Sequence, residues 1–489
     1  MTAPPRNTRR RVVAQLLRWE ARLEGDAADR YLPYVLAGLL FVIWFGLALA
    51  RERGLDAGSD LASALQSRWL ILHGHAPQST ISGHHVLAQH LPLGFYLLAW
   101  ITRVLPAVPT LLGVQSLSLA TGVIPLWRMG RRLAELRVGA VLTIVTVYAL
   151  SPTLNDLNLA DFHPGVVAVA PLLGATYLAL RGKWRGFAIV AAVAVLWSAE
   201  LGLVVAGLGV VLWLRGERRI GAWAFGAGFG WTFIAVTVLE PRYGSTGFIA
   251  PGAFERYGTN AFTIGFGMLI HPLRLSGDLL AEGNVRLLVV LLAPLLFLPV
   301  LAPRLLIPAI PLQALYLVAD TSPRPVDIGL PLTVFAFVAA TFALNRMGRK
   351  GVERVIVDRR VLIALIVAAL GFFATESGSS PYRHPWEWGR QDAADQARHD
   401  AADSVGPRVS VRAARAVLPL VAERMVVYEL RPDASAETAS DGVDRVVVDV
   451  RSLGWDAADD LRFATGVTAL GFRVTFREEG VTVYARVGT

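Results

Sequence analysis

The chain has 489 residues, of which 54% are hydrophobic and 17% are charged, and its mean hydropathy is +0.49. This composition excludes a soluble multidomain enzyme and predicts a polytopic membrane protein, since several runs approach the roughly 20 apolar residues that span a bilayer as a helix. The chain has no cysteine. Disulfides, thiolate zinc sites, iron–sulfur ligation and a cysteine nucleophile are therefore excluded.

The formal net charge of +9 is unevenly distributed. Residues 376–489 carry 14 Arg and no Lys against 18 Asp plus Glu, a net of −4, which leaves +13 for residues 1–375. A nucleic-acid-binding protein would present one contiguous basic face with interleaved aromatics, so we expect no nucleic-acid partner. The basic residues instead form short clusters between apolar runs, which is the positive-inside pattern: Arg9 to Arg11, Arg128 to Arg137, Arg181 to Arg185, Arg215 to Arg219 and Arg346 to Arg360.

With these clusters placed in the cytoplasm, the apolar runs predict about eleven transmembrane helices. Residues 1–31 are expected to be a cytoplasmic segment and residues 32–375 the transmembrane domain, localised in the cell membrane. The first run, Leu32 to Ala50, is typical of an uncleaved signal anchor. The first loop (51–90) and a loop at 240–283 would then both be extracytoplasmic.

Two apolar runs follow the first loop. If both crossed the membrane fully, the next basic cluster would lie outside. One of them is therefore expected to be short, tilted or re-entrant. The run from Gly186 to Leu214 is flanked by basic clusters at both ends, so we expect two short helices that meet outside near Glu200.

The pattern changes after Phe373. Residues 376–390 form a linker rich in Gly, Ser, Pro and aromatics, and residues 391–489 alternate Val-rich runs with helical patterns, which predicts a small extracytoplasmic α/β domain. It should lie on the same face as the first loop. The expected strands are Arg408–Val411, Met425–Tyr428, Val443–Val450, Arg473–Phe476 and Val481–Ala485, and the expected helices lie near Ala413–Leu420 and Asp456–Leu470.

The first loop concentrates polar side chains, including five of the nine histidines: His73, His75, His84, His85 and His90. None of these forms an i, i+4 pair, so the spacing argues against a zinc cluster and favours hydrogen-bonding or substrate-binding roles. Ser59 or Asp60 can cap a helix that runs to about His73. Asp60 has two open interpretations: an N-cap, or a carboxylate that acts as a general base or metal ligand.

Other polar residues stand at the predicted membrane boundary. Asp161 and His163 follow one transmembrane run, and Glu200 lies within apolar sequence, where a carboxylate is costly unless it faces a polar cavity or has a structural partner. Glu240 and Arg242 share one helix end. Arginine binds phosphate bidentately, so Arg242 and Arg256 are candidates for gripping a phosphate, ahead of the cytoplasmic Arg304.

Several of these positions recur in short motifs along the chain: Asp60-Leu61, Trp69, His73-Gly74, Gly83, His90, Leu126-Trp127-Arg128, Asp161-Phe162-His163-Pro164 and Ser198-Ala199-Glu200. Together they resemble an uncharacterised prokaryotic family of predicted membrane proteins, a domain of unknown function. That family is distantly similar to the C-type glycosyltransferases, the lipid-phosphate-sugar-dependent enzymes that include protein mannosyltransferases and aminoarabinose transferases.

The resemblance implies an acidic residue in the first outer loop as catalytic base or metal ligand, and the matching position is Asp60. A second acidic position in a later loop corresponds to Asp161, with His163 beside it. Relatives often carry a His-Tyr pair before the penultimate transmembrane segment, and this chain has Val326-Asp327 there. That departure puts the completeness of the site in question.

We therefore expect a C-type glycosyltransferase-like membrane protein that transfers a sugar from a polyprenyl-phosphate lipid to an acceptor at the outer membrane face. Its catalytic residues would be Asp60, Asp161 and His163, and the two aspartates could hold a divalent cation, Mg or Mn. The expected substrate-binding residues are His84, His85, His90, Glu200, Glu240, Arg242 and Arg256. The alternatives are a non-enzymatic transporter or assembly component for a cell-envelope polymer, and a scaffold that presents the C-terminal domain.

Overall fold

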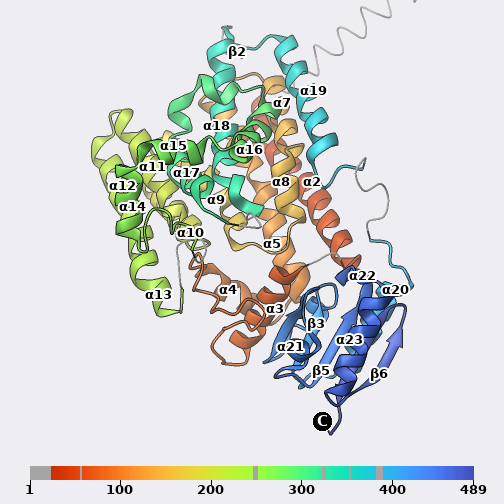
Figure 1. The fold of residues 1–489 in the computed structure, drawn as a ribbon. Coiled ribbons are helices and arrows are strands. Elements are labelled where there is room, and N and C mark those ends of the chain that lie inside the picture. The colour runs from red at the N-terminus through yellow and green to blue at the C-terminus, as the bar shows by residue number, and fades with distance from the viewer. Residues whose placement is uncertain are drawn as a thin grey trace, which may run out of the picture.

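The computed structural model describes residues 24–55, 58–245, 252–321, 326–351, 354–381 and 389–488. A large helical part, red to cyan in Figure 1, carries a small blue α/β domain at one end. The predicted N-terminal segment up to residue 23, and residues 382–388 of the predicted linker, lie outside the described residues.

The apolar runs form helices of very different lengths, as the bounds show. In chain order the helical part contains α2 (Asp26–Arg53), α3 (Ser59–Leu72), α4 (Gly94–Ile101), α5 (Ala107–Thr121), α6 (Val123–Arg132), α7 (Val138–Ala149), α8 (Pro152–Leu159), α9 (Val169–Leu180), α10 (Trp184–Val195), α11 (Leu201–Leu214), α12 (Arg218–Ile234), α13 (Glu240–Arg242), α14 (Ala261–Ile270), α15 (Pro272–Leu279), α16 (Glu282–Leu292), α17 (Ile310–Val318), α18 (Leu330–Met347) and α19 (Arg359–Glu376).

Within the described residues, the helices long and apolar enough to cross a membrane alone are Asp26–Arg53, Ala107–Arg132, Arg218–Arg242 and Asp327–Met347. The pair α7 and α8, bent by 44°, would make a fifth span. Shorter apolar helices such as α10 and α11 surround them. The number of spans predicted from the sequence stays a prediction.

Two predictions about the chain path are confirmed. After the first loop, α4 is a short helix of 8 residues, whereas α5 and α6 form one long span. The run from Gly186 to Leu214 is divided into α10 and α11, with the break between them at residues 196–200. Helices α14 and α15 occupy much of the stretch predicted as an outer loop at 240–283, and a capping box from Asn260 begins α14.

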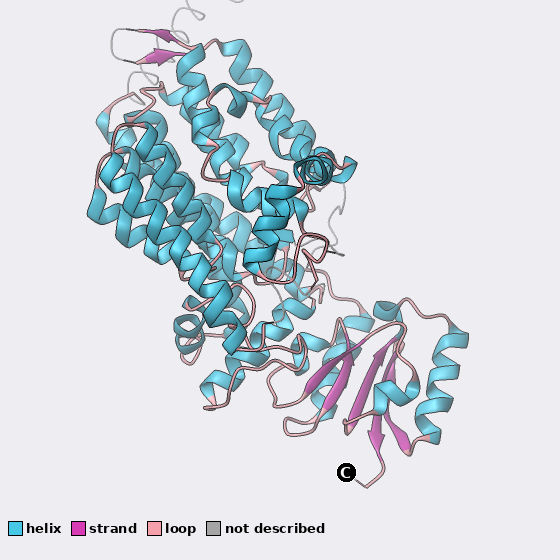
Figure 2. Ribbon diagram, turned by 60° about the vertical axis from the view of Figure 1, so that its left-hand side comes forward, coloured by secondary structure: helices cyan, strands magenta, loops and turns pink. Residues whose placement is uncertain are grey.

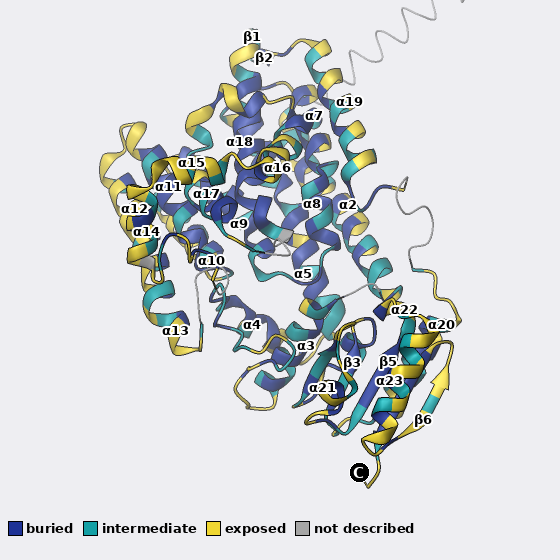
Figure 3. Ribbon diagram, in the orientation of Figure 1, coloured by how far each residue is buried: buried dark blue, intermediate teal, exposed yellow. Residues whose placement is uncertain are grey.

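Helix α18 lies at the centre of the helical part: 89% of its apolar window is buried, and Figure 3 shows it in dark blue. The outer helices α12, α14 and α15 expose apolar side chains instead, including Phe229 and Leu273. Apolar side chains on an outer surface suit contact with lipid rather than water.

The C-terminal domain is the predicted α/β unit. Its sheet has the order β4-β3-β5-β7-β6, in which β3 pairs in parallel with β4 and β5, and β7 pairs antiparallel with β5 and β6. The helix predicted near Ala413–Leu420 is wrong, because most of that stretch is strand β3 and a 3₁₀ turn. The elements are α20 (Ala393–Val405), β3 (Val411–Ala414), β4 (Val427–Leu430), α21 (Ala436–Ser440), β5 (Arg445–Asp449), α22 (Val450–Leu453), α23 (Ala457–Ala469), β6 (Phe472–Glu478) and β7 (Val481–Arg486).

Both faces of this sheet are covered, which explains its continuous valine runs. On β5, Val446 and Val448 join a core with α23, whereas Val447 joins a core with α20 and with α3 of the first loop. The first loop therefore supplies part of the hydrophobic core of the C-terminal domain.

Polar contacts reinforce this docking. Arg68 forms an ion pair with Glu423 at 2.7 Å, and the Thr80 hydroxyl binds the edge strand β4, since the Val427 N–H donates to Thr80 Oγ1 at 3.0 Å. The domain and the first loop lie together at one end, while the strand pair β1 (Arg349–Lys350) and β2 (Val355–Ile356) lies at the other end (Figures 1 and 2). This separates the C-terminal domain from the basic cluster at 346–360, as the predicted topology requires.

Candidate functional site

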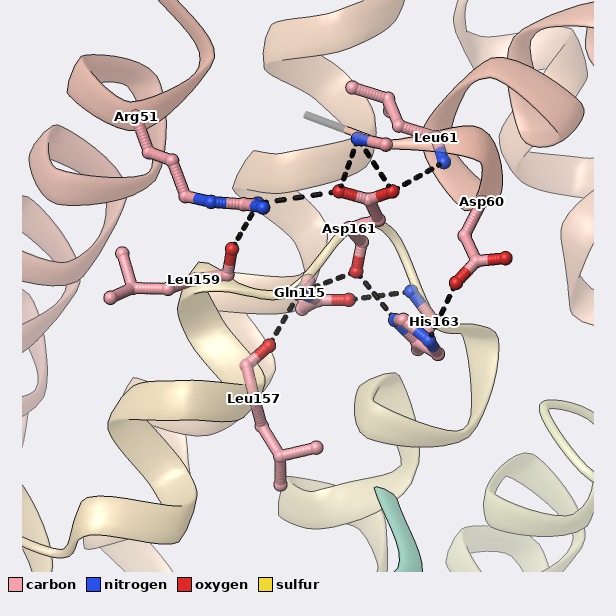
Figure 4. A network of polar contacts seen from close by, with 9 residues as sticks. Arg51, Asp60, Leu61, Gln115, Leu157, Leu159, Asp161 and His163 are labelled. Carbon is pink, nitrogen blue, oxygen red and sulfur yellow. Dashed lines mark hydrogen bonds and ion pairs between the residues drawn. The ribbon is translucent and has the colours of Figure 1, made fainter. Parts of the chain in front are cut away.

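The start of α3 is held by a carboxylate from far along the chain. Asp161 accepts hydrogen bonds from the Gly58 N–H at 2.9 Å to each of its oxygens and from the Leu61 N–H at 3.3 Å (Figure 4). Arg51 forms an ion pair with the same carboxylate at 3.3 Å. Free amides at a helix start need an acceptor, so Asp161 acts as the cap of α3.

This arrangement decides between the two interpretations of Asp60. Gly58 occupies the N-cap position of α3, and no side chain within the helix caps it. The N-cap interpretation of Asp60 is therefore wrong. The Asp60 side chain is 65% exposed and does not cap the helix. A carboxylate must be accessible in this way to take a proton from a substrate.

His163 lies against Asp60. Its Nδ1 donates to the Asp161 carbonyl at 2.6 Å, which turns Nε2 toward Asp60 Oδ2 at 3.4 Å. Gln115 fixes the histidine further by accepting its backbone N–H at 2.9 Å. The loop that follows α8 therefore positions both the cap of α3 and the partner of Asp60.

The two groups stabilise each other's charge. The hydrogen bond from His163 lowers the pKa of Asp60, although partial burial opposes this. Burial disfavours a charged His163, but the hydrogen bond to Asp60 and the charges of Asp327 and Asp60 outweigh it and raise the pKa of His163 to about 9. At neutral pH the pair is a carboxylate beside an imidazolium.

A second cluster of polar side chains lies where the first loop meets the break between α10 and α11. His90 Nδ1 and the Tyr316 hydroxyl donate to Glu200 at 2.7 and 2.6 Å, and the Ala199 N–H donates to the His90 carbonyl at 2.8 Å. The Glu200 side chain is 1% exposed. These contacts join the first loop to α17 and to the helix break, whereas substrate binding by Glu200 stays a prediction.

Electrostatic interactions connect the two groups. Burial disfavours a charged His90, but the charges of Glu200, Asp327 and Glu240 outweigh it and raise the pKa of His90 to about 9. Asp327 therefore acts on both His90 and His163. Burial lowers the pKa of His84, which lies within electrostatic range of Asp60 and His90. The residues predicted from distant parts of the sequence thus gather in one region.

Glu240 is buried at 2% exposure, and its Oε1 has no hydrogen-bond partner within the described part of the chain. The end of α13 contacts the first loop, because the Tyr243 ring stacks on His85 with ring centroids 4.6 Å apart. Arg242, between them, is exposed and makes no ion pair with a described residue. It remains available to an anionic ligand.

Arg256 differs from Arg242, because its guanidinium is already engaged by Asp278 at 3.0 Å and Asp320 at 3.2 Å. A phosphate would have to displace these carboxylates, which makes Arg256 the weaker phosphate candidate.

Asp60 and Asp161 do not fit as joint ligands of a divalent cation. Both Asp161 oxygens accept backbone amides, and Arg51 lies against one of them, so the carboxylate has positive neighbours on every bonded side. No group of three or more His, Asp and Glu side chains with metal-binding geometry occurs among the described residues.

The family of predicted membrane proteins DUF2079 has a sequence model that matches residues 55–465. The chain belongs to this family. The match spans the first loop, Asp161, His163 and most of the C-terminal domain. The family resemblance inferred from the sequence motifs is therefore confirmed. None of the curated proteins matches the sequence significantly.

Two solved structures share the fold of this DUF2079 member. Both are of ArnT from Cupriavidus metallidurans. The one bound to undecaprenyl phosphate is 14% identical, with a TM-score of 0.55 over 93% of this chain and 98% of that chain. The apo structure is 13% identical, with a TM-score of 0.53 over 94% of this chain and 99% of that chain. The predicted membrane glycosyltransferase-like fold is confirmed.

Sequence reasoning missed three residues of this DUF2079 site. Asp327 lies in the Val326-Asp327 pair that the sequence motifs already singled out, so that pair was the available signal. Tyr316 and Gln115 lie within apolar helices, and only their partners across the fold reveal their roles.

Proposed function

We propose that the protein is an inverting glycosyltransferase that moves a sugar from a polyprenyl-phosphate lipid to an acceptor hydroxyl at the extracytoplasmic face of the membrane. The observation that carries this proposal is the exposed Asp60 carboxylate, held at the start of α3 beside the His163 imidazolium. The likeness in fold to ArnT, a protein whose structure holds undecaprenyl phosphate, supports the lipid donor.

In the proposed reaction Asp60 is the general base. The acceptor oxygen forms a bond to the anomeric carbon while Asp60 takes its proton, and the bond from that carbon to the phosphate oxygen breaks. Polyprenyl phosphate leaves with the electron pair, and a single displacement inverts the anomeric configuration. No step passes through a metal ion.

His163 is a positioning residue in this mechanism. Its hydrogen bond fixes the direction of the Asp60 carboxylate and keeps that carboxylate ionised, which is the form that accepts a proton. Arg242 is the candidate for holding the donor phosphate, because it is exposed, unpaired among the described residues and next to the first loop.

An apolar groove of about 560 Å³ offers a place for a prenyl chain. It lies between α10, α11 and α12, and it runs from Trp184 to Trp231. The Trp231 ring packs against the cluster that contains Leu87 and Leu91 of the first loop. A lipid in this groove would therefore lead toward the loop that carries Asp60.

The test measures transfer of radiolabelled sugar from a panel of undecaprenyl-phosphate-linked sugars in membranes that contain the protein. Asp60→Asn should lower the transfer rate by roughly a hundredfold or more, the typical contribution of a general base. Asp433→Asn, at an exposed aspartate of the C-terminal domain, is the matched control and should leave the rate unchanged.

Native mass spectrometry with undecaprenyl phosphate adds a second readout. Asp60→Asn should bind the lipid as wild type does, because the change removes a base and no lipid contact. Equal transfer rates in wild type and Asp60→Asn would refute the proposed role of Asp60.

A further inference from the structure

A polar cleft lies where the start of the first loop, at Gly54 and Leu55, faces the C-terminal domain. It has a volume of about 710 Å³ and opens to solvent. Its walls come from the end of α2, the segment before α20, α20 itself, the residues after β3, and α22. It is distinct from the apolar groove on the helical part, which shares none of its lining residues.

Arginines dominate the charge of this cleft, although residues 376–489 as a whole carry a net charge of −4. Arg398 pairs with Asp395 at 2.6 Å and with Asp449 at 2.9 Å. These ion pairs hold α20 against the sheet. Arg398 is only 7% exposed, so these pairs already engage its guanidinium within the wall of the cleft.

Two other arginines of the cleft, Arg390 and Arg415, have no carboxylate partner among the residues that the structure describes, and both are exposed. Neither guanidinium is therefore held in an ion pair by a described residue. An exposed arginine is common on protein surfaces, but two that face one cavity create a site for an anion.

Arg415 also reaches the catalytic region. A Cβ atom at Gly58 would lie 2.8 Å from Arg415 Nε and 2.8 Å from Asp161 Oδ2, so the guanidinium rests against the backbone at the start of α3. A residue with a side chain at position 58 would push it away. Arg415 is close enough to Asp60 to act on that carboxylate electrostatically. The cleft therefore opens beside the proposed base.

We propose that this cleft binds the acceptor, and that the acceptor carries an oxyanion, a phosphate or a carboxylate, which Arg415 and Arg390 hold while its hydroxyl reaches Asp60. This inference rests on the proposed function and adds the acceptor class to it. Guanidinium groups bind such oxyanions through paired N–H donors. The apolar groove and the cleft approach the first loop from different sides, which keeps donor and acceptor apart until they meet at Asp60.

The experiment measures binding without turnover. The full-length protein in lipid nanodiscs is titrated with glucose 6-phosphate, glucuronate and glucose, and binding is followed by saturation-transfer difference NMR. The phosphate and carboxylate sugars distinguish the two oxyanion sources, and glucose is the neutral control. At least one anionic sugar should bind at least tenfold more tightly than glucose, the ratio expected when about one charge-assisted hydrogen bond is gained.

Variants locate the site. Arg390→Ala combined with Arg415→Ala should weaken binding of the anionic sugar at least tenfold, and Arg415→Lys should lose less because it keeps the charge. Arg473→Ala, at an exposed arginine of β6 outside the cleft, is the matched control and should bind as wild type does. Circular dichroism confirms that each variant is folded.

Three results would overturn the inference: no binding of either anionic sugar, equal binding of glucose, or unchanged binding in the double arginine variant. Because no donor is present, these outcomes are independent of the transfer assay. Anion binding with no sugar transfer would refute the proposed function and leave the cleft as an anion site.

Discussion

Removing the Asp161 carboxylate should loosen the start of α3 before it affects anything else. Asp161→Ala leaves the Gly58 and Leu61 amides without an acceptor and leaves Arg51 without this counter-ion. An unsatisfied buried donor costs about 1–3 kcal/mol, and loss of an N-cap costs about 1 kcal/mol. Water can reach Arg51, which is 26% exposed, and this offsets part of the loss. We expect a net destabilisation of about 3 kcal/mol.

Hydrogen exchange with mass spectrometry on the full-length protein in detergent measures this effect locally. Since 1.4 kcal/mol corresponds to a factor of ten, the amides in the first turn of α3 should exchange roughly a hundredfold faster in Asp161→Ala. Asp161→Asn keeps one carbonyl acceptor and should lose about half of that free energy.

Asp60→Ala is the control, because it removes a neighbouring carboxylate that makes no cap hydrogen bond. It should lower sugar transfer as Asp60→Asn does, while the α3 amides stay protected. Asp161 does not cap α3 if Asp161→Ala and Asp60→Ala show the same exchange in this turn. In that case Asp161 would be free to take the catalytic role that the sequence suggested.

Two further predictions concern pH and packing. The pKa of His163 is raised from 6.5 to about 9, so its pairing with Asp60 stabilises the fold fully below the lower value and is lost as the pH rises through the higher one. Between these two pH values, the thermal stability of His163→Gln should therefore decline less than that of wild type, and the decline that remains is due to His90. An equal decline in both proteins would contradict the pairing. Gly58→Ala should destabilise the protein by about 1–3 kcal/mol, because its Cβ would collide with the carboxylate that caps α3. Gly139→Ala in α7 is the matched control, since nothing lies within 4 Å of a Cβ there, and a similar loss of unfolding free energy in both variants would refute the steric argument.

The sequence by itself determined the features that depend on local composition and periodicity. Apolar runs and basic clusters identified a membrane protein, and Val-rich runs between helical patterns identified the C-terminal sheet. Helical spacing placed α3 within one residue of its observed end, and the flanking charges placed the break near Glu200. The short motifs around Asp60, Asp161 and Glu200 were sufficient to indicate the family.

Only the tertiary structure decided what each polar residue does. Asp161 is a catalytic candidate in sequence, and in the structure it caps α3, whose N-cap residue Gly58 lies 103 positions earlier. The sequence left Asp60 open between a cap and a free carboxylate, and the structure places it exposed beside His163. Arg415 comes from a separate domain and reaches the same region. The reason is physical: helix and strand periodicity is set by neighbours in the chain, whereas hydrogen-bond partners and electrostatic interactions are set by distances in space, which a single sequence does not contain.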